Sequence, residues 1–540
     1  MKNNMLSALD AHIQKLPEIY QPIYLHPEFS VLAARGCDDR LRVIAGVQQA
    51  MSLALGRPLR VLDLGCAQGF ISLSLAALGC HVTGVDFSAE NIAVCRELAH
   101  ENPHLAVDFC VDRIECYIEN IQYNQFDMVL GLSVFHHLVH ENGIASVEKL
   151  LNKLADNSAC LLLELALKQE PLYWASSLPD DPCSLLSAIA FFSVLSMHAT
   201  HLGEVARPLF FASQRYWLLD GDAQSFERVC LEPHGLAPGT HGGSRRYYYS
   251  ADKFLKWYRL DHPRGVFNRT EYARELAFLQ HIPDDFKAPG FYGHGETQTA
   301  CWIMMQRLEG DLLTVLLETK QPLDPARIMD EVLDQLCLLE QTGCYHNDLR
   351  TWNVMVQADG SCILIDYGSM VHEATDCAWP HNIYLAFILF LHELLSDKPV
   401  APQPLRAVTF NPAQFPPPYA DFVTRLWAEP RDNWSFALLR DLWHQTGQKR
   451  ALASVPLSWP AGELWANAIE QALQTLNVHL RHLENQVARA EAKVIQVEQQ
   501  THQQLQAIYC SRSWRLTRPV RFLGSWLRGC LLAIRSDNQA

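Results

Sequence analysis

The sequence predicts an α/β fold: a Rossmann-like domain with a parallel sheet, then a bilobal α+β domain, then a C-terminal α-helical coiled coil. Three observations support this prediction. Short apolar runs alternate with helical segments from about residue 58 to 165, which is the pattern of βαβ units. Aromatic and β-branched runs return over 232–320, and helical patterns dominate over 321–450. Beyond residue 465, apolar side chains recur in alternating steps of three and four, as in a heptad repeat.

Size and charge restrict the class of protein. The 540 residues, about half of them apolar, suffice for two or three domains with cores of their own. The formal net charge of −15 argues against a nucleic-acid-coating protein, because phosphate binding needs a basic face. The 16 cysteines form no CxxC pair and no cluster at zinc-ligand spacing. We therefore expect them to be mainly small buried apolar residues in a reducing compartment.

The hydropathy pattern predicts a cytoplasmic protein. The amino terminus has no apolar segment long enough for a signal peptide. The most apolar stretches, such as 383–395, are too short to span a bilayer. Any contact with a membrane is therefore expected to be peripheral.

The expected elements divide the chain into five parts. In the first part, the strands are expected near 60–64, 81–85, 126–132 and 159–163, with a further one before Asp112. The mixed patterning of 166–230 predicts a helical elaboration or connector. The predicted boundaries are 1–195 for the first domain, 196–231 for the connector, 232–455 for the second domain (N-lobe 232–310, C-lobe 311–455), 466–508 for the coil and 509–540 for a basic tail.

The first predicted binding site is a strand that runs into a glycine-bearing turn. Residues 61–69 (VLDLGCAQG) have the form DxGxxxG, and a helical pattern follows. Glycines let the backbone approach a ligand closely, and this turn lies at the carboxyl end of the first strand, where doubly wound sheets bind ligands. Asp86 ends the next strand, where a carboxylate can accept hydrogen bonds from both ribose hydroxyls. Asp112, Arg113 and Ile114 follow the third apolar run, at a position suited to contact with an adenine ring.

The form of this turn favours S-adenosylmethionine over NAD, because dinucleotide-binding turns usually read GxGxxG. Together with the run FDMVLGLSVFHHL at the expected fourth strand, residues 55–165 resemble the class I methyltransferase family. The resemblance implies cofactor contacts at Asp63, Gly65, Gly69, Asp86, Asn91, Asp112, Arg113, Ile114 and Leu132. His136 and His137, just past the fourth strand, are candidates to face the methyl acceptor, and for each a packed core histidine is an equally good interpretation.

The second predicted site is a kinase catalytic loop. Residues 345–353 (YHNDLRTWN) match the pattern HxDLxxxN, and 363–368 end in Asp-Tyr-Gly at the separation found in protein kinases. In this pattern Asp348 orients an attacking hydroxyl and accepts its proton, while Asn353 and Asp366 hold Mg²⁺ against the ATP phosphates. Upstream, Lys256 stands where a third-strand lysine would contact phosphates, and Glu275 is its expected partner.

Several features depart from the protein-kinase pattern. The glycine loop at 239–249 is degenerate, DFG is DYG, Asn347 replaces the usual Arg, and no APE segment is recognisable. The loss of this Arg and the absence of an APE segment argue against regulation by activation-loop phosphorylation and favour a sugar or small-molecule kinase. An inactive pseudokinase is the alternative, although the expected catalytic residues are all present.

The carboxyl-terminal part predicts oligomerisation and a docking segment. The heptad seam comprises Leu473, Leu476, Leu480, Leu483, Val487, Ala490, Val494 and Val497. Its mixture of Leu and Val does not distinguish a dimer from a trimer. The tail combines Arg with Trp, Phe and Leu and has no acidic residue before Asp537, as in interfacial helices that bind anionic lipid. A partner-docking helix explains the same residues.

The order of these parts, with the segments LPEIYQ, VLDLGCAQGF, GLSVFHH, SRRY, WNVMV and SRSWR, resembles the chain-terminating enzymes of bacterial polymannose O-antigens, the WbdD family. The resemblance covers nearly the whole chain. It implies that the kinase phosphorylates the terminal mannose of a lipid-linked polymannose with ATP and Mg²⁺. The methyltransferase then methylates that phosphate with S-adenosylmethionine, which stops elongation.

The same resemblance implies further residue roles and partners. S-adenosylmethionine would also contact Tyr20 and Arg40; ATP would contact Arg246, Lys256, Gln306, Leu308 and Met355; the glycan would contact Arg350 and Trp352. The coil would form a homotrimer, and the tail would bring a mannosyltransferase polymerase to the inner membrane, with no nucleic acid involved. Two alternatives remain open: direct methylation of a sugar hydroxyl with a dormant kinase, and a non-catalytic coiled-coil scaffold.

Overall fold

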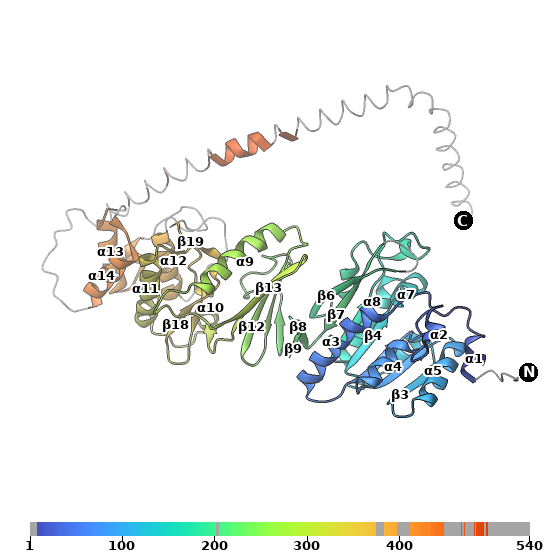
Figure 1. Cartoon of the computed structure of the whole chain (residues 1–540). Helices are drawn as coiled ribbons and strands as arrows, with labels where there is room; N and C mark the ends of the chain where they lie inside the picture. Colours follow the sequence, from blue (N-terminus) through green and yellow to red (C-terminus); the bar gives the residue numbers. More distant parts are fainter. Residues whose placement is uncertain are drawn as a thin grey trace, which may run out of the picture. The chain divides into compact units, whose positions relative to one another are not determined.

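The computed structural model describes residues 8–200, 205–373, 383–396, 411–430 and 433–447, and in the predicted coil residues 466, 469, 473, 480, 482–490 and 493–494 (Figure 1). The chain forms two compact units. The first comprises Met1–Tyr272 and Pro289–Leu308, and the second comprises Ala273–Ala288 and Glu309–Ala540. Each unit is described by itself below. The predicted tail at 509–540 lies outside the described residues.

The first unit contains the predicted Rossmann-like sheet. Its seven strands have the order β3-β2-β1-β4-β5-β7-β6. The first five in sequence pair in parallel, whereas β7 pairs antiparallel with β5 and β6. Ligands of such sheets bind at the carboxyl ends of the strands, where the strand order reverses, here between β1 and β4. The strands are β1 Arg60–Leu64, β2 His81–Asp86, β3 Val107–Val111, β4 Met128–Leu132, β5 Cys160–Glu164, β6 Phe191–His198 and β7 Arg207–Ser213.

Helices bury both faces of this sheet. Val61 and Leu162 face the core that includes α3 and α4, and the neighbouring Leu62 and Leu161 face the core that includes α7 and α8. Burial on both faces explains why the strands are continuous apolar runs. The helices of this part are α1 Ala8–Ile13, α2 Pro27–Ser30, α3 Asp38–Leu55, α4 Phe70–Ala77, α5 Ala89–Glu101, α6 Ile114–Glu119, α7 Phe135–Asn142 and α8 Ile144–Asn157.

The prediction of a helical connector over 166–230 is wrong. This segment contains β6, β7, β8 Tyr216–Leu219, β9 Asp222–Ser225 and β10 Arg228–Cys230, and its described helical turns are two short 3-10 segments, Ala175–Ser177 and Pro182–Leu186. All seven residues of β7 are buried, so its sequence lacks the alternation that marks a half-exposed strand. The predicted boundary at residue 195 falls inside β6, and the first sheet therefore extends through β7.

A second, antiparallel sheet completes the first unit. Its order is β10-β11-β12-β14-β13, with β11 Arg245–Tyr249, β12 Lys253–Arg259, β13 Phe291–Glu296 and β14 Ala300–Gln306. The helix α9 Gly265–Gln280 lies between β12 and β13 in sequence. The prediction of a small sheet with an inserted helix is confirmed, although the sheet begins at β10, before residue 232.

One hydrophobic core joins the two sheets of the first unit. The Phe191 ring of β6 lies 5.7 Å from the Tyr248 ring of β11 and 5.2 Å from the Trp257 ring of β12, between ring centroids. The Tyr248 hydroxyl donates a hydrogen bond to the Ala190 carbonyl at 2.8 Å, and Arg246 Nη1 donates to the Ile189 carbonyl at 2.9 Å. We refer to these contacts as the joint core.

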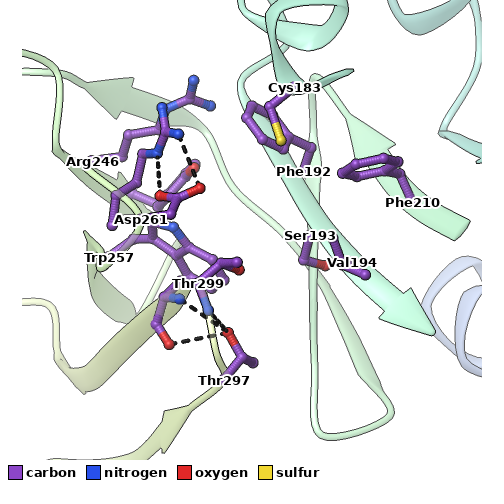
Figure 2. A pocket seen from close by; sticks show the side chains of 13 residues that line it. Cys183, Phe192, Ser193, Val194, Phe210, Arg246, Trp257, Asp261, Thr297 and Thr299 are labelled. Atoms are coloured by element: carbon purple, nitrogen blue, oxygen red, sulfur yellow. Dashed lines mark hydrogen bonds and ion pairs between the residues drawn. The ribbon is translucent and has the colours of Figure 1, made fainter. Parts of the chain in front are cut away.

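The joint core leaves one small cavity of about 60 Å³. Phe192, Val194 and Phe210 line one side, and Trp257 and Asp261 lie across from them (Figure 2). Two of its lining residues, Arg259 and Asp261, pair with each other. The sheets are thus packed against each other directly, as two layers of one domain are.

The second unit is mainly helical. It contains α10 Leu313–Glu318, α11 Pro325–Gln341, α12 Ile383–Ser396, α13 Tyr419–Ala428 and α14 Phe436–Gly447, with short strands β15 Asp311–Leu312, β16 Tyr345–His346, β17 Val354–Val356, β18 Cys362–Leu364 and β19 Met370–Val371. Asp324 caps α11 by accepting hydrogen bonds from the amides of Ala326 and Arg327. The predicted helical lobe around a compact polar loop is confirmed.

The cysteines and the apolar helices of the described residues bear on two expectations from the sequence. The cysteines described are free thiols, and most of them are buried, as expected: Cys37, Cys66, Cys80, Cys95, Cys160, Cys301, Cys337 and Cys362. Among the described residues no helix is both long and apolar enough to cross a bilayer. The most apolar helix, α12, has 14 residues.

The joint core predicts that the two sheets of the first unit unfold together. Replacing Phe191, which is fully buried, with Ala should cost about 3–5 kcal/mol of unfolding free energy, because it leaves a cavity between both sheets. We expect a single calorimetric transition at lower temperature, and weaker binding of nucleotide as well as of S-adenosylmethionine. Phe267→Ala, at a half-exposed phenylalanine of α9, is the matched control. Two separated transitions in Phe191→Ala would contradict the joint core.

Two candidate active sites

The glycine turn after β1 needs glycine at two positions. Gly65 and Gly69 have φ angles of 74° and 77°, in the left-handed region. A Cβ at Gly65 would lie 2.4 Å from Val134 Cγ1, and one at Gly69 would lie 2.9 Å from Cys95 Sγ. Glycine at both positions therefore keeps side-chain atoms away from the backbone of the turn, which a ligand bound closely at the carboxyl edge of the sheet requires.

Asp86 is held at the end of β2 by three hydrogen bonds. Its Oδ2 accepts from the Ala67 amide at 3.0 Å, and its Oδ1 accepts from the Ser88 amide at 2.9 Å and from Asn91 Nδ2 at 3.2 Å. A carboxylate oxygen can accept more than one hydrogen bond, so this arrangement leaves acceptor capacity for the ribose hydroxyls. Asn91 reaches the glycine turn as well, because its Oδ1 accepts from Gln68 Nε2 at 2.8 Å.

Asp63 has a different environment from Asp86. Its side chain is only 3% exposed, and Oδ2 accepts a hydrogen bond from the Ser72 hydroxyl at 2.6 Å. Burial raises the pKa of Asp63 to about 6, and the charge of Asp86 adds to this effect, against the Ser72 hydrogen bond. Asp63 thus ties β1 to α4 below the turn, where it supports the turn from inside the fold.

The remaining predicted cofactor residues of this sheet gather at the same edge. The Asp112 amide donates to the Asp86 carbonyl at 3.1 Å, and a Cβ at Gly65 would lie 3.8 Å from Ile114 Cδ1. Arg113 is exposed and paired with Glu115 and Glu141. With Leu132 at the end of β4, the carboxyl ends of β1 to β4 supply the set that the sequence predicted.

A buried charge cluster at the end of β5 was not predicted. Glu164, fully buried, accepts hydrogen bonds from Arg40 Nε at 2.6 Å, from the Ser133 hydroxyl at 2.8 Å and from Arg35. Arg35 also donates to the Tyr20 hydroxyl at 3.0 Å. Burial opposes ionisation of Glu164, but the two guanidinium groups outweigh it and hold its pKa below the usual value. The sequence signal that could have indicated this cluster is the single carboxylate at the end of an apolar strand (LLLE).

This cluster defines the surroundings of Tyr20 and Arg40, which the resemblance assigned to the cofactor. Arg40 is committed to Glu164, Asp39 and the Ala199 carbonyl, and it is 4% exposed. Tyr20 belongs to the amino-terminal segment, whose Gln21 amide donates to Gln68 Oε1 in the glycine turn at 3.1 Å. The amino-terminal segment is thereby attached to the glycine turn and, through Arg35, to the end of β5.

The two histidines after β4 have different environments. His136 is 4% exposed and its ring lies 4.5 Å from the Trp174 ring. Burial lowers the pKa of His136 to about 2, so this side chain is neutral at pH 7. His137 is exposed, and its Nδ1 lies 3.2 Å from the Tyr173 hydroxyl. Of the two interpretations given for each, His136 fits the packed core histidine, and His137 remains the candidate to face an acceptor.

The catalytic loop of the second unit is held in the expected arrangement. Asn353 Nδ2 donates to Asp348 Oδ2 at 2.9 Å and to the Asp348 carbonyl at 2.7 Å. The Ile365 amide donates to the Asn353 carbonyl at 3.0 Å, and His346 Nε2 lies 2.9 Å from the Ile365 carbonyl. These bonds join the loop directly to the strand that leads into Asp366.

Asp366 and Tyr367 form the turn that follows β18. Asp366 has a φ angle of 66°, a left-handed conformation that is uncommon for aspartate and concentrated at functional sites. Tyr367 is buried, its hydroxyl donates to the Leu364 carbonyl at 2.6 Å, and its ring lies 4.6 Å from that of Phe278. Tyr367, the tyrosine of DYG, therefore holds the turn in place, and its buried hydroxyl has a hydrogen-bond partner.

Asn347 stands where protein kinases usually have Arg. Among the described residues, its side chain bonds to two backbone carbonyls of the same lobe. Its Nδ2 donates to the Glu373 carbonyl at 3.0 Å and to the Tyr345 carbonyl at 3.4 Å. A neutral amide thus ties the segment after DYG to the catalytic loop. A phosphate on that segment would find no guanidinium at this position.

Two residues predicted to contact the glycan are inside the lobe. Arg350 is 2% exposed and pairs with Glu393 of α12, and Trp352 is 6% exposed. We therefore assign Arg350 no substrate contact. Motif position alone suggested one, because the sequence does not show which way the side chain turns.

The residues predicted to bind ATP are distributed over both units. Lys256 lies on β12 with its ammonium 5.9 Å from the Tyr258 ring centroid, and Gln306 ends β14 with its amide donating to the Gly290 carbonyl at 2.7 Å. Leu308 follows β14 in the first unit, whereas Met355 on β17 and the buried Glu275 belong to the second. The pairing of Lys256 with Glu275 stays a prediction.

Arg246 has another role than the one predicted. Its Nη1 donates to the carbonyls of Ile189 and Ala190, and its guanidinium carbon lies 5.0 Å from the Phe192 ring centroid. Because these contacts commit the guanidinium to the joint core, we do not include Arg246 in the ATP site.

The folds and these two groups of residues define a class I methyltransferase joined to a kinase-like α+β domain. Residues 56–180 match the family model of a methyltransferase domain. Over 495 residues the chain is 40% identical to the O-antigen chain terminator bifunctional methyltransferase/kinase WbdD of Escherichia coli, covering 90% of this chain and 69% of that protein. A solved structure of WbdD with its C-terminal bundle ordered matches with a TM-score of 0.81 at 39% identity, over 92% of this chain and 99% of that one. The chain therefore belongs to the WbdD family of bifunctional methyltransferase/kinases.

Gly65→Ala should weaken binding of S-adenosylmethionine by roughly tenfold or more, equivalent to about 1.4 kcal/mol, because the new methyl group meets Val134 at the ligand edge of the turn. Isothermal titration calorimetry of the purified protein measures this. Gly79→Ala is the matched control: its φ of 90° carries the same kind of backbone strain, but no atom lies within 4 Å of the added carbon. Equal losses of affinity in both variants would show that strain, not the turn, decides binding.

Proposed function

We propose that this protein terminates O-antigen chains by phosphorylating the terminal mannose of a lipid-linked polymannose and then methylating that phosphate. Membership of the WbdD family supports the proposal, since the relatives are named as O-antigen chain terminators. The observation that carries it is that one chain holds both a DxGxxxG crevice and an ordered Asp348–Asn353 catalytic loop. A single-step terminator would need only one of them.

The geometry of the catalytic loop supports the proposed kinase step. Asp348, partly exposed, orients the attacking sugar hydroxyl and takes up its proton. Asn353 and Asp366 supply amide and carboxylate oxygens, which are ligands that Mg²⁺ prefers when phosphates and water complete its shell. ATP, when bound with Mg²⁺, supplies the transferable phosphoryl group. Lys256, with Glu275 as its proposed partner, would contact the phosphates.

The methyl-transfer step needs no general base in this scheme. A phosphate monoester oxygen is already anionic, so no proton has to be removed before it attacks. S-adenosylmethionine, when bound, supplies an activated methyl group. Asp86 and Asn91 would bind the ribose of S-adenosylmethionine, and the turn at Gly65 and Gly69 would accommodate the side of the cofactor that lies against the protein backbone.

Direct methylation of a sugar hydroxyl is less well supported. That reaction needs a base, and His136 is buried with its pKa lowered to about 2. Partial desolvation of the His137 ring, although the residue is exposed, and the charge of Arg207 lower the pKa of His137 as well. The ordered loop around Asp348 and Asn353 would moreover have no role if the kinase were dormant.

The carboxyl-terminal part would assemble and place the enzyme. Residues 482–490 are helical, and Leu473, Leu480, Leu483, Val487 and Val494 of the heptad seam are 42% to 57% exposed. An apolar stripe of this period is buried when helices associate. We propose a homotrimeric coil that spaces the active sites from the inner membrane of a bacterium. The tail, outside the described residues, would bind the membrane surface and the mannosyltransferase polymerase on the cytoplasmic side.

Product mass after incubation with a short mannose oligosaccharide, ATP, Mg²⁺ and S-adenosylmethionine tests the proposal directly. Each cofactor is left out in turn. We expect a phosphate gain with ATP alone and a further methyl gain only when both cofactors are present. A methyl gain without ATP would refute the order of steps and favour direct hydroxyl methylation.

Asp348→Asn should lower the rate of phosphorylation by about 10²- to 10⁴-fold, the usual contribution of a general base, and should abolish methylation of the unmodified oligosaccharide. Affinity for S-adenosylmethionine should not change. Supplying chemically phosphorylated oligomannose should restore methylation to the rate of the unaltered enzyme. Failure of this rescue would mean that the methyltransferase needs the kinase for more than its product.

The length of the coil should set the length of the glycan. Deleting one heptad between Leu473 and Val497 shortens a helix by roughly 10 Å at 1.5 Å per residue and keeps the seam in register. We expect shorter chains after this deletion and longer chains after insertion of one heptad, seen on gels of lipopolysaccharide from complemented cells. A glycan length distribution that is the same in both variants would contradict the spacer role.

A further inference from the structure

Glu393 of α12 lies directly behind the catalytic loop. Its carboxylate is fully buried and pairs with the Arg350 guanidinium, which is itself 2% exposed. The Thr351 hydroxyl donates to Glu393 Oε2 at 3.3 Å. On its other face the guanidinium carbon lies 4.2 Å from the centroid of the Trp352 ring, a cation–π distance. We call Glu393, Arg350 and Trp352 the buried stack.

The buried stack places a charge on an otherwise apolar helix. The sequence of α12 is IYLAFILFLHELLS, and Glu393 is its only acidic residue. Burying an ion pair removes both charges from water, and an apolar pair of similar volume often gives equal or greater stability. Stability alone therefore does not explain why a carboxylate and a guanidinium occupy this position.

The buried stack holds the backbone between Asp348 and Asn353, the two residues with proposed roles in phosphoryl transfer. Arg350 and Trp352 lie between Asp348 and Asn353 in the chain. The Asn353 amide donates to the Arg350 carbonyl at 2.9 Å, and Asn353 Nδ2 then donates to Asp348. Fixing the Arg350 side chain thus fixes the turn that sets the relative position of Asp348 and Asn353.

We propose that Glu393 is a positioning residue for the kinase, which acts through Arg350 to hold Asp348 and Asn353 in the geometry of phosphoryl transfer. Its full burial keeps its side chain away from direct contact with a ligand. This inference rests on the proposed kinase function. Because a displacement of about 1 Å can cost roughly 10²-fold in rate, a small shift of the loop suffices for a large loss.

The test compares three variants of the full-length protein. Glu393→Gln keeps the shape and loses the charge, so we expect kcat for phosphorylation to fall by about 10²-fold. KM for ATP should change less than about threefold, because no ATP contact is removed. Glu393→Asp, which retains the charge, should recover part of kcat. Glu170→Gln, at the buried pair with Arg207 near the first sheet, is the matched control and should leave phosphorylation unchanged.

A double variant separates positioning from stability. Arg350→Met with Glu393→Leu replaces the ion pair by apolar side chains, and we expect a melting temperature close to that of the unaltered protein with kcat still reduced about 10²-fold. A double variant that is stable and has the original kcat would overturn the inference. So would a Glu393→Gln enzyme with unchanged kcat.

Hydrolysis of ATP in the absence of glycan separates this inference from the proposed function. The same loop must position water for that slow reaction, so Glu393→Gln should slow it as well. If Glu393→Gln hydrolyses ATP more slowly while the unaltered protein transfers no phosphate to mannose, mannose is refuted as the substrate and the role of Glu393 is retained. Unchanged ATP hydrolysis in Glu393→Gln would refute that role whatever the acceptor is.

Discussion

The joint core is the constraint on which the first unit depends. β6 closes the methyltransferase sheet on one side and contacts β11 and β12 of the second sheet through Phe191 on the other. The aromatic residues at this contact cannot be exposed to water without losing the burial of several large rings, each of which buries roughly 150–250 Å². The sheet that carries Lys256 is therefore folded against the methyltransferase sheet.

Much of the fold was predictable because local patterns decide it. The strands β1, β2, β4 and β5 are short apolar runs bounded by turns, and the glycine turn at 65–69 carries a steric requirement that is visible in the sequence. The catalytic loop was predictable for the same reason, since Asp348 and Asn353 are five residues apart and bond to each other within one turn.

What could not be predicted depends on contacts between distant segments. The arginines at 35 and 40 meet Glu164 only after the sheet has formed, and Arg246 turns towards the Ile189 carbonyl because β6 lies beside β11. Arg350 was assigned to the glycan from its place in the motif, but its direction is decided by Glu393, which is 43 residues away in the sequence. The strand β7 was missed because it is buried on both faces, which removes the alternation that distinguishes a strand.

The cluster around Glu164 makes the attachment of the amino-terminal segment sensitive to acid. Arg35 fastens Tyr20 to this carboxylate, and the folded-state pKa of Glu164 is lower than the usual value of 4.5. A carboxyl whose pKa is depressed by folding contributes stability above its unfolded pKa and loses it as the pH falls through the folded pKa. Protonation would remove the carboxylate charge that Arg35 and Arg40 share and leave Asp39 to offset Arg40 alone. Strong acidification would therefore weaken the attachment of the segment around Tyr20 to the end of β5.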